Sequence, residues 1–331
     1  NTEKVVSTNL TDDNSFVEFN TLVDTNSTSD VGEAYSEVNH DTIAKILFTS
    51  GSTGQPKGVI NTQRMLCSNQ QAISQVWKFL EDKPPVTVDW LPWNHTFGGN
   101  HNLNMILRNG GTLYIDSGKP APGLIDKTVA NLKEISPTIY FNVPRGFDML
   151  LPYFETDKRL RETFFRNLDV IFYAAAALTQ STWDKLEALS RQTIGEQVMM
   201  LSGWGATETA PDCTQVYWPI SKAGVIGIPI PSTKLKLTPN EGKLEIKVKG
   251  PNVTPGYWKQ PELTKRAFDE EGYYRIGDAV RFEDIEKPEK GIIFDGRVAE
   301  NFKLSSGTWV SVGNIRTDIL AKIDRVAQDI V

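Results

Sequence analysis

The sequence predicts an α/β fold in which a mainly parallel sheet covered by helices is followed by a small antiparallel, barrel-like β subdomain. The first observation is that strand-like and helix-like segments alternate between residues 43 and 202, which is typical of a parallel sheet with helices on both faces. The second is a change of texture, because residues 220–297 carry short strand-like segments separated by Pro, Gly and Asn. One of them, Lys243–Val248, alternates polar and apolar residues as antiparallel strands do.

The elements follow in order. Residues 1–40 are polar and irregular, and we expect loops around one short strand near Phe16–Phe19. The apolar run Ile43–Thr49 predicts a buried strand before a turn rich in Gly, Ser and Thr. The other expected strands are Val86–Leu91, Thr112–Asp116, Thr138–Val143, Val170–Ala174, Val198–Ser202, Lys234–Leu237, Lys243–Val248 and Tyr273–Ile276. The expected helices are Arg64–Leu80, Ile125–Ile135, Arg145–Tyr153, Lys158–Arg166, Ser181–Thr193 and Asn314–Ile330.

Length and composition exclude several classes of protein. The chain has 331 residues, and 39% of them are hydrophobic and 23% charged, which indicates a globular protein of about two domains. Its net charge of −6 gives no overall attraction for nucleic acid or anionic lipid. Cys67 and Cys213 cannot form a disulfide framework, and with three histidines they are too few and too scattered for a convincing zinc site.

The sequence shows no sign of membrane insertion or secretion. It has no apolar run of about 18 residues, and its first residues lack the charged-then-apolar plan of a signal peptide. We therefore expect a cytoplasmic protein. Because the chain begins with Asn1 and not with Met, we also expect it to be a fragment.

The most informative segment is TSGSTGQPKG, which directly follows the strand expected at Ile43–Thr49. Its glycines let the backbone turn tightly, so that consecutive N–H groups point into one concavity that favours anions. Hydroxyl groups and a lysine add donors and positive charge. The segment differs from a Walker A loop and from G-x-G-x-x-G, and a polar surface turn is the alternative. The predicted polyphosphate site comprises Thr49, Ser50, Gly51, Ser52, Thr53, Gly54 and Lys57.

Three further segments carry weaker signals. In GWGATET, after the strand expected to end near Ser202, Glu208 lies beside hydroxyl groups and suits a metal–phosphate site, while Trp204 offers a face for a base. Asp278 in YRIGD could accept hydrogen bonds from vicinal hydroxyls, although a turn-forming Gly-Asp is the simpler interpretation. Arg297 in FDGR alone indicates a β-turn with solvated charges.

His95 lies among aromatic residues and glycines in LPWNHTFGGN, where it could line a pocket for an organic substrate. A hydrogen-bonded structural histidine is the alternative, and from this segment alone it is favoured. The other two histidines, His40 and His101, have no supporting sequence context.

Taken in order, TSGSTGQPKG, GWGATET, YRIGD and FDGRVAENFK resemble the motifs of the adenylate-forming (AMP-binding) superfamily, which includes acyl-CoA synthetases, luciferases and peptide-synthetase adenylation domains. The connecting segments LPWNHTFGGNHNLNMILRNGGTLYIDSGKPAPG, YFNVPRG, FYAAAAL and KVKGPNVTPGYWKQPELT resemble bacterial feruloyl-CoA synthetases. The resemblance covers residues 42 to 316. It implies a ligase in which a carboxylate attacks the α-phosphorus of ATP, and the thiol of coenzyme A then displaces AMP.

The resemblance also implies roles for individual residues. The phosphate segment, with Lys57, would hold the β- and γ-phosphates, Thr207 would contact the α-phosphate, and Glu208 would bind Mg²⁺. Asp278 and Arg297 would hold the ribose, and His95 would lie between the acyl pocket and the α-phosphate. Adenine would lie between aromatic and backbone groups of Trp204, Gly205, Ala175, Ala176 and Ala177.

An aromatic-walled pocket suits a flat hydroxycinnamate such as ferulate; its expected walls are Trp93, His95, Phe97, Phe141, Asn142 and Tyr173. Three alternatives stay open: a ligase for a fatty or other aryl acid, an adenylation domain that delivers the acyl group to a carrier protein, and a truncated nucleotide-binding remnant. The expected partners are therefore small molecules, namely the acid, ATP and coenzyme A, and neither nucleic acid nor a membrane span.

Some features depart from the family pattern. Alanines replace the usual glycines in FYAAAAL, the hinge position is Ala299, and Asn301 stands where the subgroup tends to have Asp. We expect the family's N-terminal portion and its C-terminal lid, with the lid lysine, to be missing, so that the chain itself binds ATP weakly and catalyses poorly. The expected organisation is residues 1–65 as the remainder of a first α/β subdomain, 66–215 as a second, 216–298 as the β subdomain and 299–331 as the hinge and start of the lid.

Overall fold

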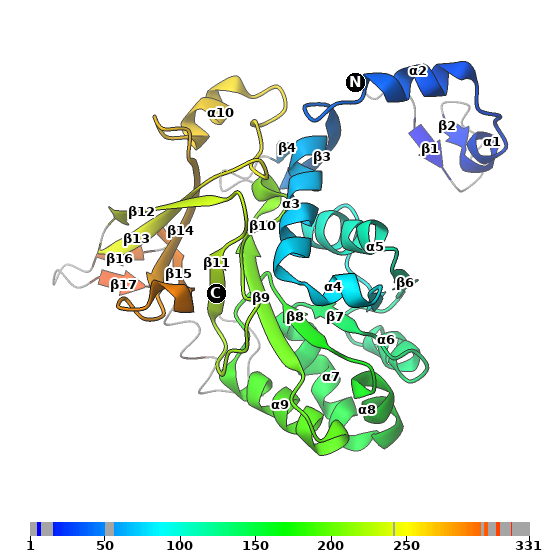
Figure 1. Cartoon of the computed structure of the whole chain (residues 1–331), viewed down its shortest axis with the longest axis vertical. Helices are drawn as coiled ribbons and strands as arrows, with labels where there is room; N and C mark the ends of the chain where they lie inside the picture. The colour runs from blue at the N-terminus through cyan, green and yellow to red at the C-terminus, as the bar shows by residue number, and fades with distance from the viewer. Residues whose placement is uncertain are drawn as a thin grey trace. The chain divides into compact units, whose positions relative to one another are not determined.

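The computed structural model describes residues 5–7, 16–49, 56–240, 242–298, 301–303, 309–311 and 319. The chain divides into two compact units, Asn1–Thr42 and Ile43–Val331 (Figure 1). The predicted phosphate residues Ser50, Gly51, Ser52, Thr53 and Gly54 lie outside the described residues, as does Ala299. So does the helix predicted at 314–330, apart from residue 319.

The first unit contains short elements with no fully buried side chain among its described residues. Strands β1 (Val5–Ser7) and β2 (Phe16–Glu18) pair in parallel, and helices α1 (Phe19–Val23) and α2 (Ser29–Glu37) follow. The strand near residue 16 is confirmed, but the expectation of loops elsewhere is wrong for these two helices. The sequence pattern missed them because neither helix buries an apolar face.

The second unit begins with an antiparallel pair, β3 (Ile43–Thr49) and β4 (Lys57–Thr62), in which Thr49 lies opposite Lys57. Helix α3 (Gln63–Val76) starts where the Thr62 hydroxyl accepts a hydrogen bond from the Met65 backbone N–H at 3.4 Å. After it come α4 (Phe79–Asp82), β5 (Val86–Asp89), the π-helical segment η1 (Thr96–Leu103), α5 (Asn104–Asn109) and β6 (Thr112–Ile115).

The parallel part of the fold consists of β5 paired with β6, and of β7 (Ile139–Asn142), β8 (Val170–Tyr173) and β9 (Met199–Gly205) paired in that order. The Thr138 backbone N–H donates to the Val86 carbonyl at 2.8 Å, which brings β5 beside β7. The helices between these strands are α6 (Ile125–Leu132), α7 (Pro144–Thr156), α8 (Lys158–Phe165) and α9 (Gln180–Ile194). The predicted α/β class is therefore confirmed.

Alternation along the central strands divides the core into two layers. Tyr140 and Ile171 face one cluster, which also contains side chains of α6, α7, α8 and α9. Phe141 and Phe172 face the other, which contains Ile73 of α3 and side chains of η1 and α5. Figure 1 shows β7–β9 in green with α7, α8 and α9 packed along them. Burial on both faces explains why these strands are continuous apolar runs in the sequence.

The parallel strands continue into an antiparallel sheet in the spatial order β12-β13-β14-β15-β11-β10-β9. The connecting element between β9 and β10 is a single 3₁₀ turn, η2 (Thr207–Thr209). The strands are β10 (Asp212–Gln215), β11 (Val225–Pro229), β12 (Lys234–Asn240), β13 (Lys243–Lys249), β14 (Tyr274–Phe282) and β15 (Ile292–Arg297). Helix α10 (Pro261–Ala267), the turn η3 (Pro288–Lys290) and the pair β16 (Asn301–Lys303) and β17 (Trp309–Ser311) complete the unit.

The structure corrects five of the sequence-based assignments. Strand β9 extends through Gly203–Gly205 because these residues pair with β10. Both YRIGD and FDGR lie within strands β14 and β15, so the interpretation of each as a turn is wrong. The predicted helix Arg64–Leu80 is divided at Trp77, whose backbone leaves the helical region. The helical segment η1 was missed because the Gly98-Gly99 pair disfavours a helix by intrinsic propensity.

We expect Phe164→Ala to destabilise the protein by about 3–5 kcal/mol, because it removes a ring from a packed aromatic layer. Phe164 has no exposed surface, and its ring centre lies 4.6 Å from that of Phe154 and 5.1 Å from that of Tyr140. The matched control Leu107→Ala truncates a side chain of α5 that is 70% exposed and should change stability by less than about 0.5 kcal/mol. Urea unfolding followed by tryptophan fluorescence measures both, and equal losses would contradict the assignment of this core.

Candidate functional site

The carboxylate of Asp278 joins the end of the parallel sheet to the antiparallel sheet. Trp204 at the end of β9 donates its indole N–H to Asp278 Oδ2 at 2.8 Å. Arg297 Nε lies 3.0 Å from Asp278 Oδ1, and the two residues are cross-strand partners in β14 and β15. Asp278 is buried whereas the Arg297 side chain is 54% exposed.

Backbone geometry aims Asp278 at this position. Gly277 has φ +83°, a conformation that favours glycine, and the pairing of β14 with β15 shifts register between Asp278 and Val280. Such an irregularity redirects a strand side chain. The structure thus brings together three of the residues that the sequence predicted for the nucleoside, from segments far apart in the chain.

A second group surrounds Glu208 in η2. The Tyr257 hydroxyl donates to Glu208 Oε1 at 2.9 Å and lies 3.1 Å from the Tyr274 hydroxyl. Burial, followed by the negative charge of Glu208, raises the pKa of Tyr257, so this phenol stays protonated and keeps its proton to donate. Lys57 Nζ lies 5.1 Å from the centre of the Tyr257 ring, within range of a cation–π contact. One tyrosine therefore contacts both the predicted phosphate lysine and the predicted metal carboxylate.

Residues 254–258 fasten these elements together. The Trp258 backbone N–H donates to the Gly58 carbonyl at 2.7 Å, and the Thr254 N–H donates to the Glu208 carbonyl at 2.8 Å. Strand β4 starts at Lys57, opposite Thr49 in β3. The two described ends of the predicted phosphate segment are therefore held in one ladder and tied to η2.

The backbone around η2 is fixed by close packing. A Cβ on Gly205 would lie 1.8 Å from the Pro211 carbonyl oxygen, so only glycine fits there. Thr209 is fully buried, and its hydroxyl accepts from the Ala206 N–H at 2.8 Å and donates to the Pro211 carbonyl. Thr207 and Glu208 are consequently held in a single buried turn. This packing explains why a glycine is required at position 205 without any contact to a ligand.

The predicted adenine group lies at the carboxyl ends of two neighbouring parallel strands. Ala175, Ala176 and Ala177 follow β8 and are exposed, and Ala175 has φ +73°. Trp204 ends β9, but it is 8% exposed and packs in the core of the antiparallel sheet. Parallel strands place both groups at the same sheet edge, where α/β proteins bind ligands. The sandwiching of adenine between them stays a prediction.

The six residues predicted to wall the acyl pocket fall into two sets. Trp93 and His95 are exposed, and His95 Nδ1 accepts from the Phe97 N–H at 3.2 Å at the start of η1. Partial burial lowers the pKa of His95. The other four are buried in packed or hydrogen-bonded positions, so they do not face an open cavity in this structure; they are Phe97, Phe141, Asn142 and Tyr173.

The buried set has structural partners. Phe97 and Phe141 pack edge to face in the core, with ring centres 6.3 Å apart. Asn142 donates to the Tyr140 hydroxyl at 3.1 Å and accepts from the Trp90 indole N–H at 3.1 Å. The Tyr173 hydroxyl accepts from the Gly224 N–H at 3.2 Å. The prediction from residue type alone could not separate a pocket wall from the core behind it.

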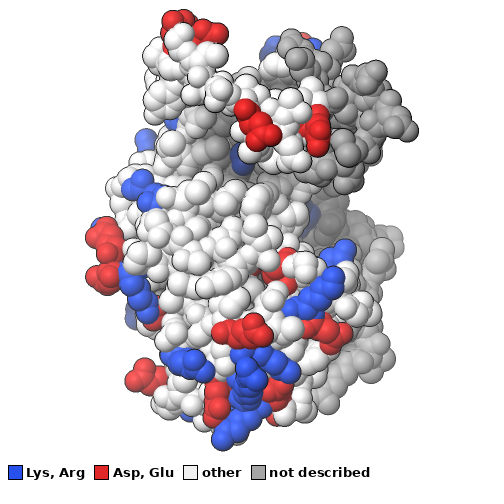
Figure 2. Space-filling view, turned by 90° about the vertical axis from the view of Figure 1, so that its right-hand side faces the viewer, with Lys and Arg blue, Asp and Glu red and all other residues white. Residues whose placement is uncertain are grey.

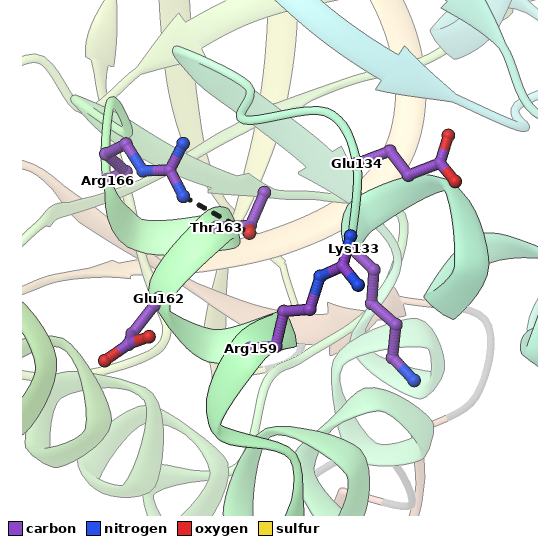
Figure 3. Close-up of a pocket in the computed structure, with 6 residues that line it drawn as sticks. All are labelled: Lys133, Glu134, Arg159, Glu162, Thr163 and Arg166. Atoms are coloured by element: carbon purple, nitrogen blue, oxygen red, sulfur yellow. Dashed lines mark hydrogen bonds between the residues drawn. The ribbon is translucent and has the colours of Figure 1, made fainter.

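Two cavities lie away from this site. One of about 390 Å³ is bordered by α8 and the end of α6 (Figure 3), and its lining is formed by Lys133, Glu134, Arg159, Glu162, Thr163 and Arg166. Figure 2 shows that lysine and arginine are interleaved with acidic residues at this lower end of the molecule. A second cavity of about 840 Å³ borders the first residues of β9 and includes Trp218 and Met199. Neither lining contains a residue of the predicted site.

The sequence prediction missed a buried polar group next to η2. His101 Nε2 lies 3.3 Å from Asp212 Oδ2, and its Nδ1 lies 2.8 Å from Asn102 Oδ1. The sequence context of His101 gave no indication of this pairing. Asp212 is distant in sequence, so no local motif links it to His101; the available signal was the polar run Asn100-His101-Asn102 inside an otherwise apolar stretch.

Among the described residues, no group of three or more His, Cys, Asp or Glu side chains could hold a metal ion by itself. In the same described part of the chain, every helix is too short or too polar to cross a lipid bilayer.

Comparison with known proteins shows consistent similarity. Malonate–CoA ligase of Arabidopsis thaliana is 26% identical over 263 residues, which cover 74% of this chain and 41% of the relative. Carboxylic acid reductase of Mycobacterium marinum is 27% identical over 300 residues, or 85% of this chain and 24% of the relative. The crystal structure of ATP-bound MatB from Rhodopseudomonas palustris matches with a TM-score of 0.66 and 27% identity, covering 87% of this chain and 54% of that one.

This chain therefore spans less than half the length of these two curated relatives and about half the length of MatB. The family described as AMP-binding enzyme matches residues 1–258, which is most of the sequence. The match includes the phosphate segment, η2 and Tyr257, while the structure adds Asp278 and Arg297 beyond its end. The chain belongs to the AMP-binding enzyme family.

Proposed function

We propose that the protein is an ATP-dependent acid–CoA ligase that forms an acyl-adenylate and then an acyl-CoA thioester. The single observation that carries the proposal is the convergence at the end of β9 of a buried, tryptophan-bound carboxylate, Asp278, with the Glu208–Tyr257–Lys57 group. The first group suits a ribose and the second suits phosphates. Family membership and the similarity to a malonate–CoA ligase and to an ATP-bound structure support the same function.

The chemistry needs no nucleophile from the protein. A carboxylate oxygen of the substrate attacks the α-phosphorus, and pyrophosphate leaves with the electron pair of the broken P–O bond. The thiol sulfur then attacks the acyl carbon, AMP leaves, and the thiol proton passes to solvent or a base. The contribution of this chain is to orient the nucleotide and to offset charge on the phosphate oxygens through donors such as Thr207 and Lys57.

The residues present fit a magnesium ion that is shared with the nucleotide. Glu208 provides a buried carboxylate whose Oε1 is held by Tyr257, and Mg²⁺ is commonly bound through one or two carboxylates together with substrate phosphates. This agrees with the lack of a multi-carboxylate cluster among the described residues. When bound, the ion would supply positive charge to the phosphate oxygens.

The identity of the acid is the finer part of the proposal. Segment resemblance favours ferulate or a related hydroxycinnamate, and the exposed Trp93 beside His95 suits a flat ring. The burial of Phe97, Phe141 and Tyr173 weakens the argument from an aromatic wall, and one relative is named for malonate. An aromatic acid stays our first hypothesis because of the segment resemblance, with fatty and dicarboxylic acids as competitors. We further propose a cytoplasmic location.

A second candidate function is an adenylating domain that passes the acyl group to an acceptor other than free coenzyme A. The similarity to a carboxylic acid reductase favours this second function, since 85% of this chain aligns with that protein. Its name refers to a carboxylic acid and does not mention coenzyme A. Both functions share the adenylation step and differ in the acceptor.

We expect Glu208→Gln to lower acid-dependent ATP–pyrophosphate exchange by about a hundredfold or more, because the metal carboxylate is lost. Glutamine keeps an oxygen that accepts from Tyr257, so the thermal unfolding midpoint should stay near that of the wild type. The matched control is Glu262→Gln, an exposed carboxylate of α10. Unchanged exchange in the Glu208 variant, measured with the full-length gene product, would contradict the role of this carboxylate.

Replacement of Lys57 by alanine should raise the KM for ATP by about tenfold to a hundredfold, since a hydrogen bond to a charged group is worth about 1.5–3 kcal/mol. Lys78→Ala is the control, because that lysine is 69% exposed at the start of α4. Steady-state ATP consumption at saturating acid measures both variants. If the two lysines proved equivalent, Lys57 would not belong to the phosphate site.

A panel of ferulate, p-coumarate, benzoate, octanoate and malonate tests the acid, with kcat/KM for adenylate formation as the measured quantity. We expect the hydroxycinnamates to exceed the others by at least about tenfold, since the loss of one methylene-sized contact already costs about that much. Acyl transfer to free coenzyme A, compared with a phosphopantetheinylated carrier protein, separates the two candidate functions. A preference for octanoate or malonate would remove the ferulate hypothesis and leave the ligase assignment intact.

A further inference from the structure

We propose that Asn100, His101 and Asn102 form a positioning hub. The hub fixes η1, and with it His95, relative to strand β4 and to the turn that carries Glu208. His101 is the central member, and Asp212 is its anchor on the other side. The inference rests on the proposed function, because it concerns residues that would act on the nucleotide and the acid through others.

His101 is enclosed on every side. Its ring has no exposed surface, stacks on Phe172 with ring centres 5.4 Å apart, and meets the edge or face of Trp77 at 6.0 Å. A polar ring in such a layer is costly unless both nitrogens find partners. Nε2 lies 3.3 Å from Asp212 Oδ2 in β10, and Nδ1 lies 2.8 Å from Asn102 Oδ1.

A neighbouring hydrogen bond orients the amide that faces the His101 ring. Asn102 donates its amide to Asp89 Oδ2 at 2.8 Å, which leaves its oxygen to face His101. Both ring nitrogens of His101 therefore face oxygen atoms, an arrangement that favours the protonated ring. Burial lowers the pKa of His101, but the contacts with Asp212 and Asn102 and the charge of Asp89 together outweigh burial, so the pKa of His101 is raised.

Other charged groups complete the electrostatic surroundings. Asp89 in β5 also accepts from the Leu91 N–H at 2.9 Å, and burial raises its pKa to about 6, so it is ionised at neutral pH. Asp116, which follows β6, acts on Asp89 as a second negative charge. The imidazolium of His101 thus lies between the carboxylate of Asp212 on one side and the Asn102-linked carboxylate of Asp89 on the other.

Asn100 connects the same helical segment to the phosphate strand. Its amide donates to Asn61 Oδ1 in β4 at 2.7 Å and to the Thr96 hydroxyl at 3.0 Å. Gln70 of α3 donates to the carbonyls of Asn100 at 2.9 Å and His101 at 3.2 Å. Strand β4 begins at Lys57, so these contacts relate η1 to the predicted phosphate lysine.

Close packing transmits this position to the loop that carries His95. A Cβ on Gly99 would lie 2.1 Å from the Trp93 carbonyl oxygen, and one on Gly98 would lie 2.5 Å from the Leu91 carbonyl oxygen. Two glycines therefore let residues 91–93 rest directly on η1. A shift of η1 must move this loop, and His95, which caps the N-terminus of η1, moves with it.

The Asp212 end of the hub reaches Glu208 through the backbone. The carbonyl of Asp212 accepts from Asn69 at 3.0 Å and from Asn252 at 2.7 Å, and the same two amides contact the Thr209 carbonyl. The segment from Thr209 to Asp212 is thus held from α3, from the 250–254 turn and from His101. Because Thr209 directly follows Glu208, loss of the His101 contact would loosen the turn at the predicted metal carboxylate.

Three variants test the hub. His101→Phe keeps a ring for stacking and removes both polar contacts, Asp212→Asn removes the charge but keeps an acceptor, and the double variant removes the contact without leaving an unpaired buried carboxylate. The matched control is His40→Phe, which breaks an exposed His40–Asp41 pair of 3.0 Å. Acid-dependent ATP–pyrophosphate exchange gives kcat and KM, and urea unfolding gives stability.

We expect His101→Phe to lower kcat by about tenfold to a hundredfold with the KM for ATP changed less than about threefold, since displaced groups slow the chemical step. The double variant should be more stable than His101→Phe but should have the same low kcat. Asp212→Asn should keep more activity than His101→Phe or the double variant. His40→Phe should match the wild type. Recovery of both stability and kcat in the double variant would reduce the hub to a stabilising contact and overturn the proposal, as would an unaltered kcat in His101→Phe.

Amide hydrogen exchange tests the hub without any need for turnover. In the double variant, exchange should quicken in residues 96–103 and 206–212 and stay as in the wild type in β7 and β8. If protection in those two segments were unchanged, the hub would be refuted even for an active enzyme. An inactive wild type with the expected exchange pattern would instead contradict the proposed function and leave the hub standing.

Discussion

The candidate site depends on the pairing of the buried Asp278 carboxylate with Trp204 and Arg297. A carboxylate in that position requires partners, because burial of an unpaired charge costs several kcal/mol. It obtains one from the indole of Trp204, which ends the parallel strand β9, and one from Arg297 across the antiparallel ladder. The carboxylate of Asp278 thereby links the end of β9 to the antiparallel strands β14 and β15.

Tyrosine and amide side chains extend this principle to the rest of the site. Tyr257 satisfies Glu208 and supports Lys57 with its ring, while Asn69 and Asn252 satisfy the carbonyls that follow η2. Tyr257, Asn69 and Asn252 carry no charge, so they hold Glu208 and Lys57 without adding a competing charge. An amide can bridge two segments with a donor and an acceptor at fixed geometry, which suits it to positioning.

The aromatic layer on one face of β7 and β8 contains two of the residues that the sequence predicted as walls of an acyl pocket. Phe97, Phe141 and Phe172 pack with Trp77 around the buried imidazole of His101. Of the six predicted wall residues, Trp93 and His95 are exposed, while Phe97 and Phe141 belong to this layer. The His101 ring is itself packed into the layer, so the proposed hub and the aromatic layer are in direct contact.

Local sequence determined the class of fold and most of the elements of the second unit, because burial on both faces makes β7, β8 and β9 continuous apolar runs and gives α6–α9 a helical period. It also identified candidate binding residues, since each lies in a short motif; they are Trp204, Glu208, Asp278 and Arg297. Only the tertiary structure decided that Gly277-Asp278 and FDGR lie within strands, that Phe141 and Tyr173 are core, and that His101 pairs with Asp212. The reason is physical: a motif records which groups a segment offers, but burial and pairing are set by partners that lie far away along the chain.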